Sequence, residues 1–222
     1  MERHGTAALT TQAWLGEEPV EVDGLPYRWR ASHGRAVSVG SDEVISLAPG
    51  EQHLAGDLLL RAVERAGVVA LRVFDPRAPR RAALVGIDAF APDPAWIVDA
   101  TFVPAQESSI RIERFDGVSV DDALAGSVRF RLAEHDVALV AFPGGEGGSW
   151  ITFGDQTNGT TTKQFRFLTL PAPGADGRVE IDFNRAHLPP CAFSEHYLCP
   201  LPPPDNRLRF PVEAGETYPI LR

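Results

Sequence analysis

A proline-rich segment near the carboxyl end, residues 189–208, constrains the fold more than any other part of the sequence. It contains six prolines and both cysteines of the chain. Because proline lacks a backbone N–H donor and fixes φ, such a segment cannot form a long helix or a central strand. Apolar residues, including Phe193, Leu201 and Leu208, are scattered through it, whereas a disordered linker would lack them. We therefore predict an ordered, irregular strap, and this name is kept for residues 189–208.

The rest of the chain consists of short segments in which apolar and polar residues alternate, such as residues 27–30, 96–102 and 150–153. A period of two is typical of strands, and turns at short intervals indicate a sandwich or a barrel. No long segment has the 3.6-residue period of a helix. We predict an all-β fold, a sandwich or partly open barrel, with the strap closing one side. Five aromatic side chains are expected in its core rather than in a ligand cage: Trp29, Trp96, Trp150, Phe165 and Phe167.

Two local patterns refine this prediction. Residues 58–63 and 68–74 are strand-like, and the turn residues between them, which include Ala66 and Gly67, predict a hairpin. Residues 8–15 instead predict a short helix that ends at the Gly and Pro residues that follow.

Length and charge bound the class of protein. The 222 residues contain no long linker, so we predict a variable amino-terminal segment, residues 1–24, and one β-rich domain, residues 25–222. The net charge of −9 argues against nucleic acid and anionic membranes as partners, because both attract basic surfaces. No apolar run approaches the ~20 residues that span a bilayer, and no signal peptide is visible. These observations predict a soluble, cytoplasmic protein and leave its oligomeric state open.

A glycine-rich segment, residues 143–148, invites comparison with phosphate-binding loops. It lacks the Gly-Lys-Ser/Thr ending, and no helical pattern follows it. We therefore predict a hairpin connection here, and no cofactor.

An arginine lies between two aromatic residues in a strand-like segment. Arg166 follows Phe165 and precedes Phe167. If its side chain faces the interior, it needs an acidic partner, because a buried unpaired charge is costly. Asp155, just before this segment, and Asp182, on the following one, are the candidates.

These residues predict one polar cluster beneath the strap. Consecutive strands usually lie side by side, so the ends of three successive strands would meet at one edge of a sheet. The predicted cluster consists of Asp155, Thr157, Arg166, Asp182 and Asn184. The leading hypothesis is small-molecule binding in a polar pocket beside the strap. The alternatives are a structural clasp, a protein-interaction module that docks through the strap, and an enzyme, such as a hydrolase, that uses Asp155, Asp182 or Cys191.

The two cysteines raise the question of a metal site. Cys191, His196 and Cys199 lie close together in the sequence, and His187 precedes them. Structural zinc sites almost always have four ligands, and the paired Cys-x-x-Cys spacing is missing here. We predict no metal and two buried, reduced thiols that pack the strap. A disulfide is the alternative if the two Cα atoms lie within about 7 Å.

Three blocks of residues carry a resemblance to a known family. The first block comprises Arg72, Asp75-Pro76, Pro79, Gly86, Phe90, Pro92 and Trp96. The second comprises Phe153, Asp155, Thr157, Gly159, Thr162, Arg166 and Leu168. The third comprises Asp182-Phe183-Asn184, Ala186, Pro189-Pro190-Cys191-Ala192-Phe193, Cys199-Pro200-Leu201-Pro202-Pro203, Asn206, Leu208 and Ala214-Gly215-Glu216.

With these blocks the chain resembles a bacterial family called domain of unknown function 1684, over roughly residues 25–218. The third block is the most specific, because many rare residues recur at fixed spacing, among them Cys191, Cys199 and Asn206 of the strap. The amino-terminal segment departs from the family pattern. The resemblance implies an ordered strap and brings no established activity, cofactor or ligand.

Overall fold

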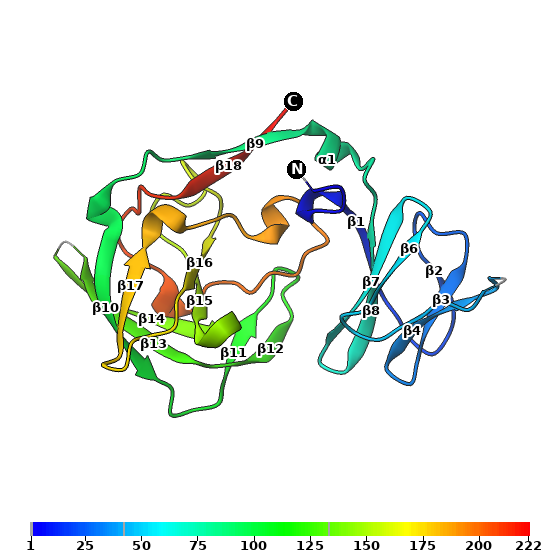
Figure 1. Ribbon diagram of the computed structural model, residues 1–222, viewed down its shortest axis with the longest axis horizontal. Coiled ribbons are helices and arrows are strands. Elements are labelled where there is room, and N and C mark those ends of the chain that lie inside the picture. The colour runs from blue at the N-terminus through cyan, green and yellow to red at the C-terminus, as the bar shows by residue number, and fades with distance from the viewer. Residues whose placement is uncertain (1, 42, 133) are drawn as a thin grey trace. The chain divides into compact units, whose positions relative to one another are not determined.

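The structure, a computed structural model, describes residues 2–41, 43–132 and 134–222. Antiparallel strands dominate it (Figure 1), which confirms the predicted all-β fold. The chain divides into two compact units. The first contains the chain up to Val85, with Phe193–Tyr197 and Leu221–Arg222, and the second contains Gly86–Ala192 and Leu198–Ile220. A compact unit is not by itself an independent domain, so the single domain over residues 25–222 stays a prediction.

The first unit is a small sandwich of two four-stranded antiparallel sheets. One sheet has the strand order β1 (Leu9–Trp14), β8 (Val68–Phe74), β7 (Leu58–Arg65), β6 (Gln52–Ala55). The other has the order β2 (Val20–Glu21), β3 (Arg28–Ser32), β4 (Arg35–Val39), β5 (Ser46–Leu47). Apolar side chains of both sheets form one core, in which Trp29 of β3 lies with Leu60 of β7 and Leu71 of β8. Each sheet therefore turns one face to this core, and Phe74 of β8 is buried in a separate small cluster with Ala8 and Leu9.

Two sequence predictions have different outcomes in this unit. β7 and β8 form the predicted hairpin, and Ala66 and Gly67 in its loop have φ angles of 51° and 81°, as a type I′ turn requires. The helix predicted over residues 8–15 is wrong. A 3-10 turn, η1 (Thr6–Ala8), is followed by strand β1, whose backbone pairs with β8. The β-branched Thr10 and Thr11 favour this extended structure.

The second unit is built on a six-stranded antiparallel sheet that curls into an open half-barrel (Figure 1). Its strand order is β16 (Arg166–Leu170), β15 (Ser149–Phe153), β14 (His135–Pro143), β13 (Gly126–Leu132), β10 (Ile97–Pro104), β17 (Arg178–Asp182). β16 and β17 follow each other in the sequence but are the two edge strands of the sheet. The partly open barrel of the prediction is thus confirmed.

Smaller elements complete the chain. β11 (Ser109–Glu113) pairs with β12 (Ser119–Ala123), and β9 (Leu84–Ala89) pairs with β18 (Glu216–Leu221). The described residues contain one α-helix, α1 (Pro79–Ala83), and further 3-10 turns: η2 (Pro94–Trp96), η3 (Gly145–Gly147), η4 (Phe183–Arg185), η5 (Pro190–Ala192) and η6 (Pro204–Asn206). Within the described ranges, no helix has the length and apolar character needed to cross a membrane.

The core of the second unit lies on the inner face of the half-barrel. Alternate residues of its strands point inward, as Ile151 of β15 and Leu168 of β16 illustrate. Phe183, directly after β17, lies at the centre, and its ring centroid is 5.8 Å from that of Phe130 and 5.6 Å from that of Phe153. The side chains between these inward positions therefore point to the outer face of the sheet.

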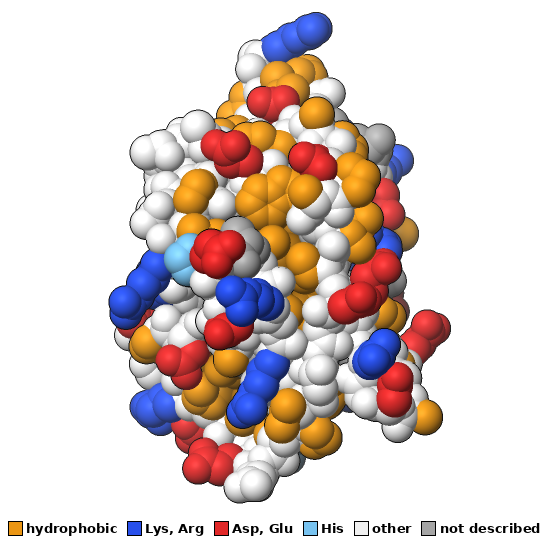
Figure 2. Space-filling view, turned by 90° about the vertical axis from the view of Figure 1, so that its left-hand side faces the viewer, with side chains coloured by type: hydrophobic (Ala, Val, Ile, Leu, Met, Phe, Trp, Pro, Cys, Tyr) orange, Lys and Arg blue, Asp and Glu red, His pale blue; other side chains and the backbone are white. Residues whose placement is uncertain are grey.

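The strap is ordered and irregular, as predicted. Its later part is held to strands of the second unit, because Leu201 N–H donates to Glu113 O (2.8 Å) and Leu208 N–H donates to Gly154 O (2.8 Å). Its middle, Phe193–Tyr197, groups with the first unit. Figure 2 shows one face of the molecule, on which basic, acidic and hydrophobic side chains are interspersed.

Candidate functional site

Arg166 faces the interior, which is the case in which the sequence analysis required an acidic partner. Its side chain and that of Asp155 have no exposed surface, and Arg166 Nη2 lies 2.8 Å from Asp155 Oδ2. Thr157 completes the group, since its N–H and its hydroxyl donate to Asp155 Oδ1 at 2.8 and 2.5 Å. The guanidinium carbon lies 5.2 Å from the centre of the Phe153 ring. The structure thus brings together three of the five residues of the predicted cluster.

This buried group also holds the backbone that follows the strap. Arg166 Nη1 donates to Ala214 O, and Arg166 Nη2 donates to Val212 O at 2.8 Å. Asp155 Oδ1 in turn accepts from Val212 N–H at 3.2 Å. Burial lowers the pKa of Arg166, and Asp155 opposes this effect. We name Asp155, Thr157 and Arg166 the clasp, because Arg166 and Asp155 tie their own segments to each other and to the backbone at Val212 and Ala214, and Thr157 orients Asp155.

Asp182 and Asn184 do not join the clasp, so the prediction of a single polar cluster is wrong in its geometry. Asp182 Oδ1 accepts from the backbone N–H and the side-chain amide of Asn184, at 3.0 and 2.9 Å. Asn184 also exchanges two hydrogen bonds with the backbone of Asp93. The reason is the strand order: β17 is an edge strand paired with β10 and lies across the sheet from β15. Asn184 also lies in turn η4, beyond the end of the strand.

Asn206 of the strap is fully buried and replaces part of a sheet ladder. β14 and β15 pair directly only at Phe142–Trp150 and Pro143–Ser149, and continuing this register would place Val140 opposite Thr152. The amide of Asn206 fills that gap. It accepts from Val140 N–H (2.7 Å) and donates to Val140 O (2.9 Å) and Thr152 O (2.8 Å). Three backbone groups are satisfied by one side chain.

The two cysteines are free thiols that lie close together. Cys199 is buried, as predicted, whereas Cys191 is half-buried. Cys191 N–H donates to Cys199 Sγ at 3.3 Å. Hydrogen bonding to Cys199 and burial raise the pKa of the Cys191 thiol. In the part of the chain that the structure describes, no three His, Cys, Asp or Glu side chains gather as metal ligands would.

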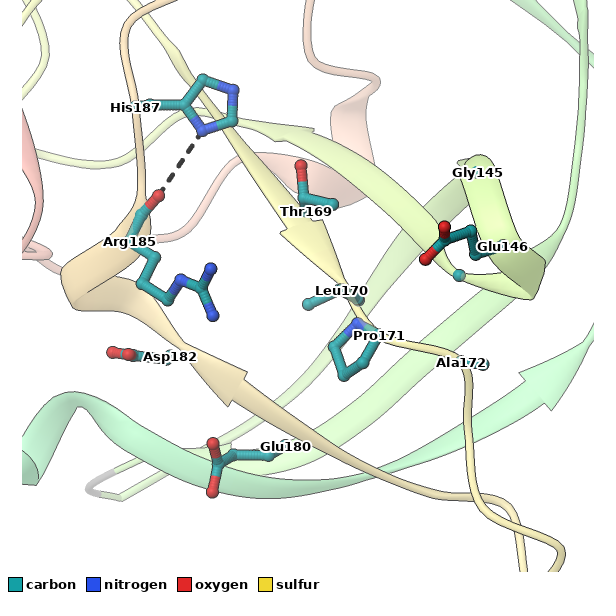
Figure 3. A pocket seen from close by; sticks show the side chains of 11 residues that line it. Gly145, Glu146, Thr169, Leu170, Pro171, Ala172, Glu180, Asp182, Arg185 and His187 are labelled. Carbon is teal, nitrogen blue, oxygen red and sulfur yellow. Dashed lines mark hydrogen bonds between the residues drawn. The ribbon is translucent and has the colours of Figure 1, made fainter.

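An open hollow of about 460 Å³ lies between the two edge strands of the half-barrel, and we name it the acidic hollow. Figure 3 shows Glu146 of η3 and Arg185 of η4 extending toward each other across it. Glu180 and Asp182 of β17 add two more carboxylates. Among the described residues, Arg185 has no carboxylate within the 4.0 Å of an ion pair. The hollow therefore presents charged groups that other side chains do not neutralise.

The backbone of β16 adds hydrogen-bonding groups at the same place. Phe167 exchanges two backbone hydrogen bonds with His187, at 2.9 and 2.8 Å. Alternate residues of a strand direct N–H and C=O to the same edge, so Thr169, two residues further on, directs its own toward the acidic hollow that it lines. His187 lines the hollow as well, and its Nδ1 lies 3.5 Å from Arg185 O.

A second hollow, of about 560 Å³, adjoins the first, and we name it the aromatic hollow. Gly145, Thr169 and His187 line both. Trp150 and Phe167 form its wall, with ring centroids 5.4 Å apart. The two hollows together are called the groove below.

An ion pair also lines the aromatic hollow. Arg114 donates to Asp122 Oδ1, whereas Asp122 Oδ2 is buried without a hydrogen-bond partner. Burial raises the pKa of Asp122, and Arg114 opposes this effect. Pro200 of the strap lines the same hollow, so the groove lies beside the strap.

The groove contains residues that the sequence analysis missed. Trp150 and Phe167 were expected in the core, but both are half-buried and line the groove. The alternation of side chains along a strand could have identified them. Ile151 and Leu168, their neighbours, are fully buried, so Trp150 and Phe167 point to the opposite face of the sheet. The other members come from four elements and from the segment that follows η4, and no motif links them: Glu146 of η3, Thr169 of β16, Glu180 of β17, Arg185 of η4 and His187.

Comparison with known proteins assigns the chain to a family. It is a mostly β protein with an open half-barrel and a proline-rich strap, and it belongs to the family described as protein of unknown function (DUF1684), whose model matches residues 82–217. The expected membership is confirmed, although the match begins later than residue 25. It covers nearly the same residues as the second compact unit.

A solved structure is similar to part of the chain. An uncharacterised protein from Haloarcula marismortui, determined by NMR in solution, is 31% identical, and the similarity covers 60% of this chain and 76% of that chain with a TM-score of 0.50. That relative is archaeal, so these comparisons do not place the present chain in bacteria. No curated protein matches.

Proposed function

We propose that the second unit binds a small polyhydroxylated ligand, of the saccharide class, in the groove beside the strap. One observation carries this proposal: carboxylates and an arginine without ion-pair partners adjoin an aromatic wall, and Thr169 and His187 belong to both parts. Ligand sites combine apolar and aromatic walls with a few polar groups that fix orientation, and the groove has both.

Each part of the groove suits a different part of such a ligand. The C–H face of a pyranose ring would lie against Trp150 and Phe167, where apolar contact is favourable. Its hydroxyls would donate to the carboxylates of Glu180 and Asp182 and accept from Arg185, because hydrogen bonds to charged groups are the strong ones. The backbone N–H and C=O of Thr169 offer one further donor and acceptor.

The charge of the groove bears on which ligands it admits. Its lining contains four carboxylates and two guanidinium groups: Glu146, Glu180, Asp182 and Asp122 against Arg185 and Arg114. An excess of negative charge disfavours phosphates and other anions. Asp155 is buried in the clasp and Cys191 lies outside the groove lining, so we propose binding rather than hydrolysis by these residues.

The test is a titration of the pure protein with neutral saccharides, followed by amide NMR shifts and by the indole N–H NMR signal of Trp150. We expect saturable changes at groove residues, and a loss of affinity of about ten-fold in Glu180→Gln and in Arg185→Gln, because each variant removes a charged hydrogen-bonding partner. Asp136→Asn is the matched control, since Asp136 is exposed on β14 outside the groove. The absence of saturable binding, or equal affinity in all three variants, would contradict the proposal.

A further inference from the structure

The second unit contains another hollow with different chemistry. It has a volume of about 260 Å³, below the range of about 300–1,000 Å³ of drug-sized sites. Its apolar surface comes from Phe115, Phe165, Pro189 and Ala192. We name it the lysine hollow, because Lys163 lines it together with Cys191 and Tyr218. It shares no lining residue with the groove.

Lys163 is the one lysine of the sequence, and its backbone is held in place. Lys163 N–H donates to Thr217 O at 3.1 Å, and Asn158 Nδ2 donates to Lys163 O at 2.8 Å. Its ammonium lies 5.4 Å from the centre of the Tyr218 ring. The Tyr218 hydroxyl donates in turn to Thr162 O at 2.8 Å. The ring beneath the cation is therefore fixed as well.

No carboxylate neutralises this cation among the described residues. No ion pair within 4.0 Å involves Lys163, and no Asp or Glu lines the hollow. The positive charge of Lys163 also lowers the pKa of the Cys191 thiol, against the larger effects of Cys199 and burial that raise it. The positive charge of Lys163 is therefore felt by a group that lines the hollow. Lys163 is thus a cation without a carboxylate partner in the described part of the chain, and it lies beside an apolar wall.

We propose that the lysine hollow binds a small organic monocarboxylate. The carboxylate would pair with the Lys163 ammonium, and the hydrocarbon part would lie against Phe165 and Ala192, which are buried, and Phe115, which is 44% exposed at the rim. Charge complementarity selects this class: a neutral ligand leaves the cation without a partner, and an organic amine meets a like charge. The inference does not depend on the proposed saccharide site, where the excess charge has the opposite sign.

The experiment compares three probes of the same length: hexanoate, hexanamide and hexylamine. Binding to the full chain is followed by amide NMR shifts of the residues that line the lysine hollow. We expect hexanoate to bind about ten-fold more tightly than hexanamide, the size of effect that a hydrogen bond to a charged group supplies, and hexylamine to bind least. Equal affinity for hexanoate and hexanamide, or no binding of hexanoate, would overturn the proposal.

Variants of the lysine separate charge from fold. Lys163→Gln should reduce the ratio of the affinities for hexanoate and hexanamide to near one. Lys163→Arg should retain the wild-type ratio, because it keeps the positive charge. Among the described residues the Lys163 ammonium donates no hydrogen bond, and its contact is with the Tyr218 ring. Lys163→Arg keeps the cation over this ring and should unfold at the wild-type temperature, whereas Lys163→Gln loses a cation–π contact and should stay folded with a slightly lower Tm. Arg185→Gln, in the groove, should leave hexanoate binding unchanged. Unchanged hexanoate preference in Lys163→Gln, or its loss in Arg185→Gln, would contradict this site.

Discussion

The two compact units bury different kinds of side chain. The first packs an apolar cluster around Trp29, and its two sheets satisfy their backbone groups by direct strand pairing. The second encloses a fully buried arginine, its carboxylate partner and an asparagine, namely Arg166, Asp155 and Asn206. Buried polar groups of this kind cost free energy unless they are hydrogen-bonded. In the second unit most of them are, whereas Arg166 Nε, Asp122 Oδ2 and Thr217 Oγ1 have no hydrogen-bond partner among the described residues.

The strap explains the difference. A segment with six prolines forms few ladder hydrogen bonds, so other groups must hold the strap and the chain around it. Asn206 reaches from the strap into the gap between β14 and β15, and Arg166 holds the backbone after the strap at Val212 and Ala214. Rare residues in a sequence can therefore mark the places where side chains replace strand pairing. The family match covers the unit that uses them.

The largest expected effect comes from breaking the clasp. Arg166→Ala leaves the carboxylate of Asp155 buried without its cation, and we expect the free energy of unfolding to fall by about 3–5 kcal/mol. Urea denaturation of both proteins measures the difference. An Arg166→Ala protein with wild-type stability would contradict the structural role of the clasp.

The first unit provides a matched control for this variant. Arg35 pairs with Glu51 at 2.8 Å, but the two side chains are 39% and 54% exposed. Exposed ion pairs contribute about 0–1 kcal/mol, so Arg35→Ala should cost far less than Arg166→Ala. Equal losses in the free energy of unfolding would contradict the distinction between the buried ion pair of the second unit and the exposed ion pair of the first.

The clasp was predictable from the sequence in part. Arg166 stands between Phe165 and Phe167 in an alternating strand, and the cost of burying an unpaired charge requires an acidic partner. Asp155 lies close enough in the sequence to be that partner, and it is. The hairpin at Ala66-Gly67 was predictable for the same reason, because its signal is local.

The failures all concern long-range pairing. Asp182 was expected beside Arg166 because their strands are consecutive, but the half-barrel places β16 and β17 at opposite edges of the sheet. Most of the predicted helix, Leu9–Trp14, forms a strand because β8, some sixty residues later, pairs with it. Trp150 lines the groove because curvature and strand order expose its face of the sheet. Local patterns indicate that Trp150 and Ile151 point to opposite faces and that Thr10 and Thr11 favour a strand, but they do not contain the strand order or the curvature of the sheet.

A core variant of the first unit tests whether the two units unfold together. Trp29→Ala removes a fully buried ring whose Nε1–H has no hydrogen-bond partner, and we expect a loss of about 3 kcal/mol from the lost packing. The chain passes between the units at four points, since each unit is made of separate segments. We therefore expect one transition, shifted by Trp29→Ala as by Arg166→Ala. Two transitions, each sensitive to one variant, would contradict the single domain predicted over residues 25–222.

A smaller effect is expected from changing one atom of Asn206. Asn206→Asp keeps the size of the side chain but removes the two N–H donors to Val140 O and Thr152 O. We expect a loss of about 1–3 kcal/mol from the orphaned groups. Gln12→Glu is the control in the first unit: Gln12 Oε1 accepts from Arg72 Nε at 2.7 Å, and a carboxylate would accept more strongly. Differential scanning calorimetry should show a lower Tm for Asn206→Asp and no loss for Gln12→Glu.

The smallest effects are expected from two ion pairs in which the pKa of the carboxylate is shifted in opposite directions. In the first unit, the backbone N–H of Ala48, aided by Arg35, lowers the pKa of Glu51 below 4.5. A depressed pKa in the folded state gives stability that is present above pH 4.5 and is lost as the pH falls. In the second unit, burial raises the pKa of Asp122 above 3.8 despite Arg114. A raised pKa gives stability that is present below pH 3.8 and is lost as the pH rises.

Variants without these titrating groups isolate the two contributions. Glu51→Gln and Asp122→Asn keep the shape of each side chain, and urea denaturation at several pH values between 3 and 7 gives the stability of each relative to the unaltered protein. The advantage of the unaltered protein over Glu51→Gln should shrink as the pH falls through the pKa of Glu51. Its stability relative to Asp122→Asn should instead increase as the pH falls from 7, because protonation removes a charge that is buried with one oxygen unpaired. If both differences changed in the same direction, the exposed Arg35–Glu51 pair and the half-buried Arg114–Asp122 pair would respond alike to pH. The contrast between the two units would then not extend to their ion pairs.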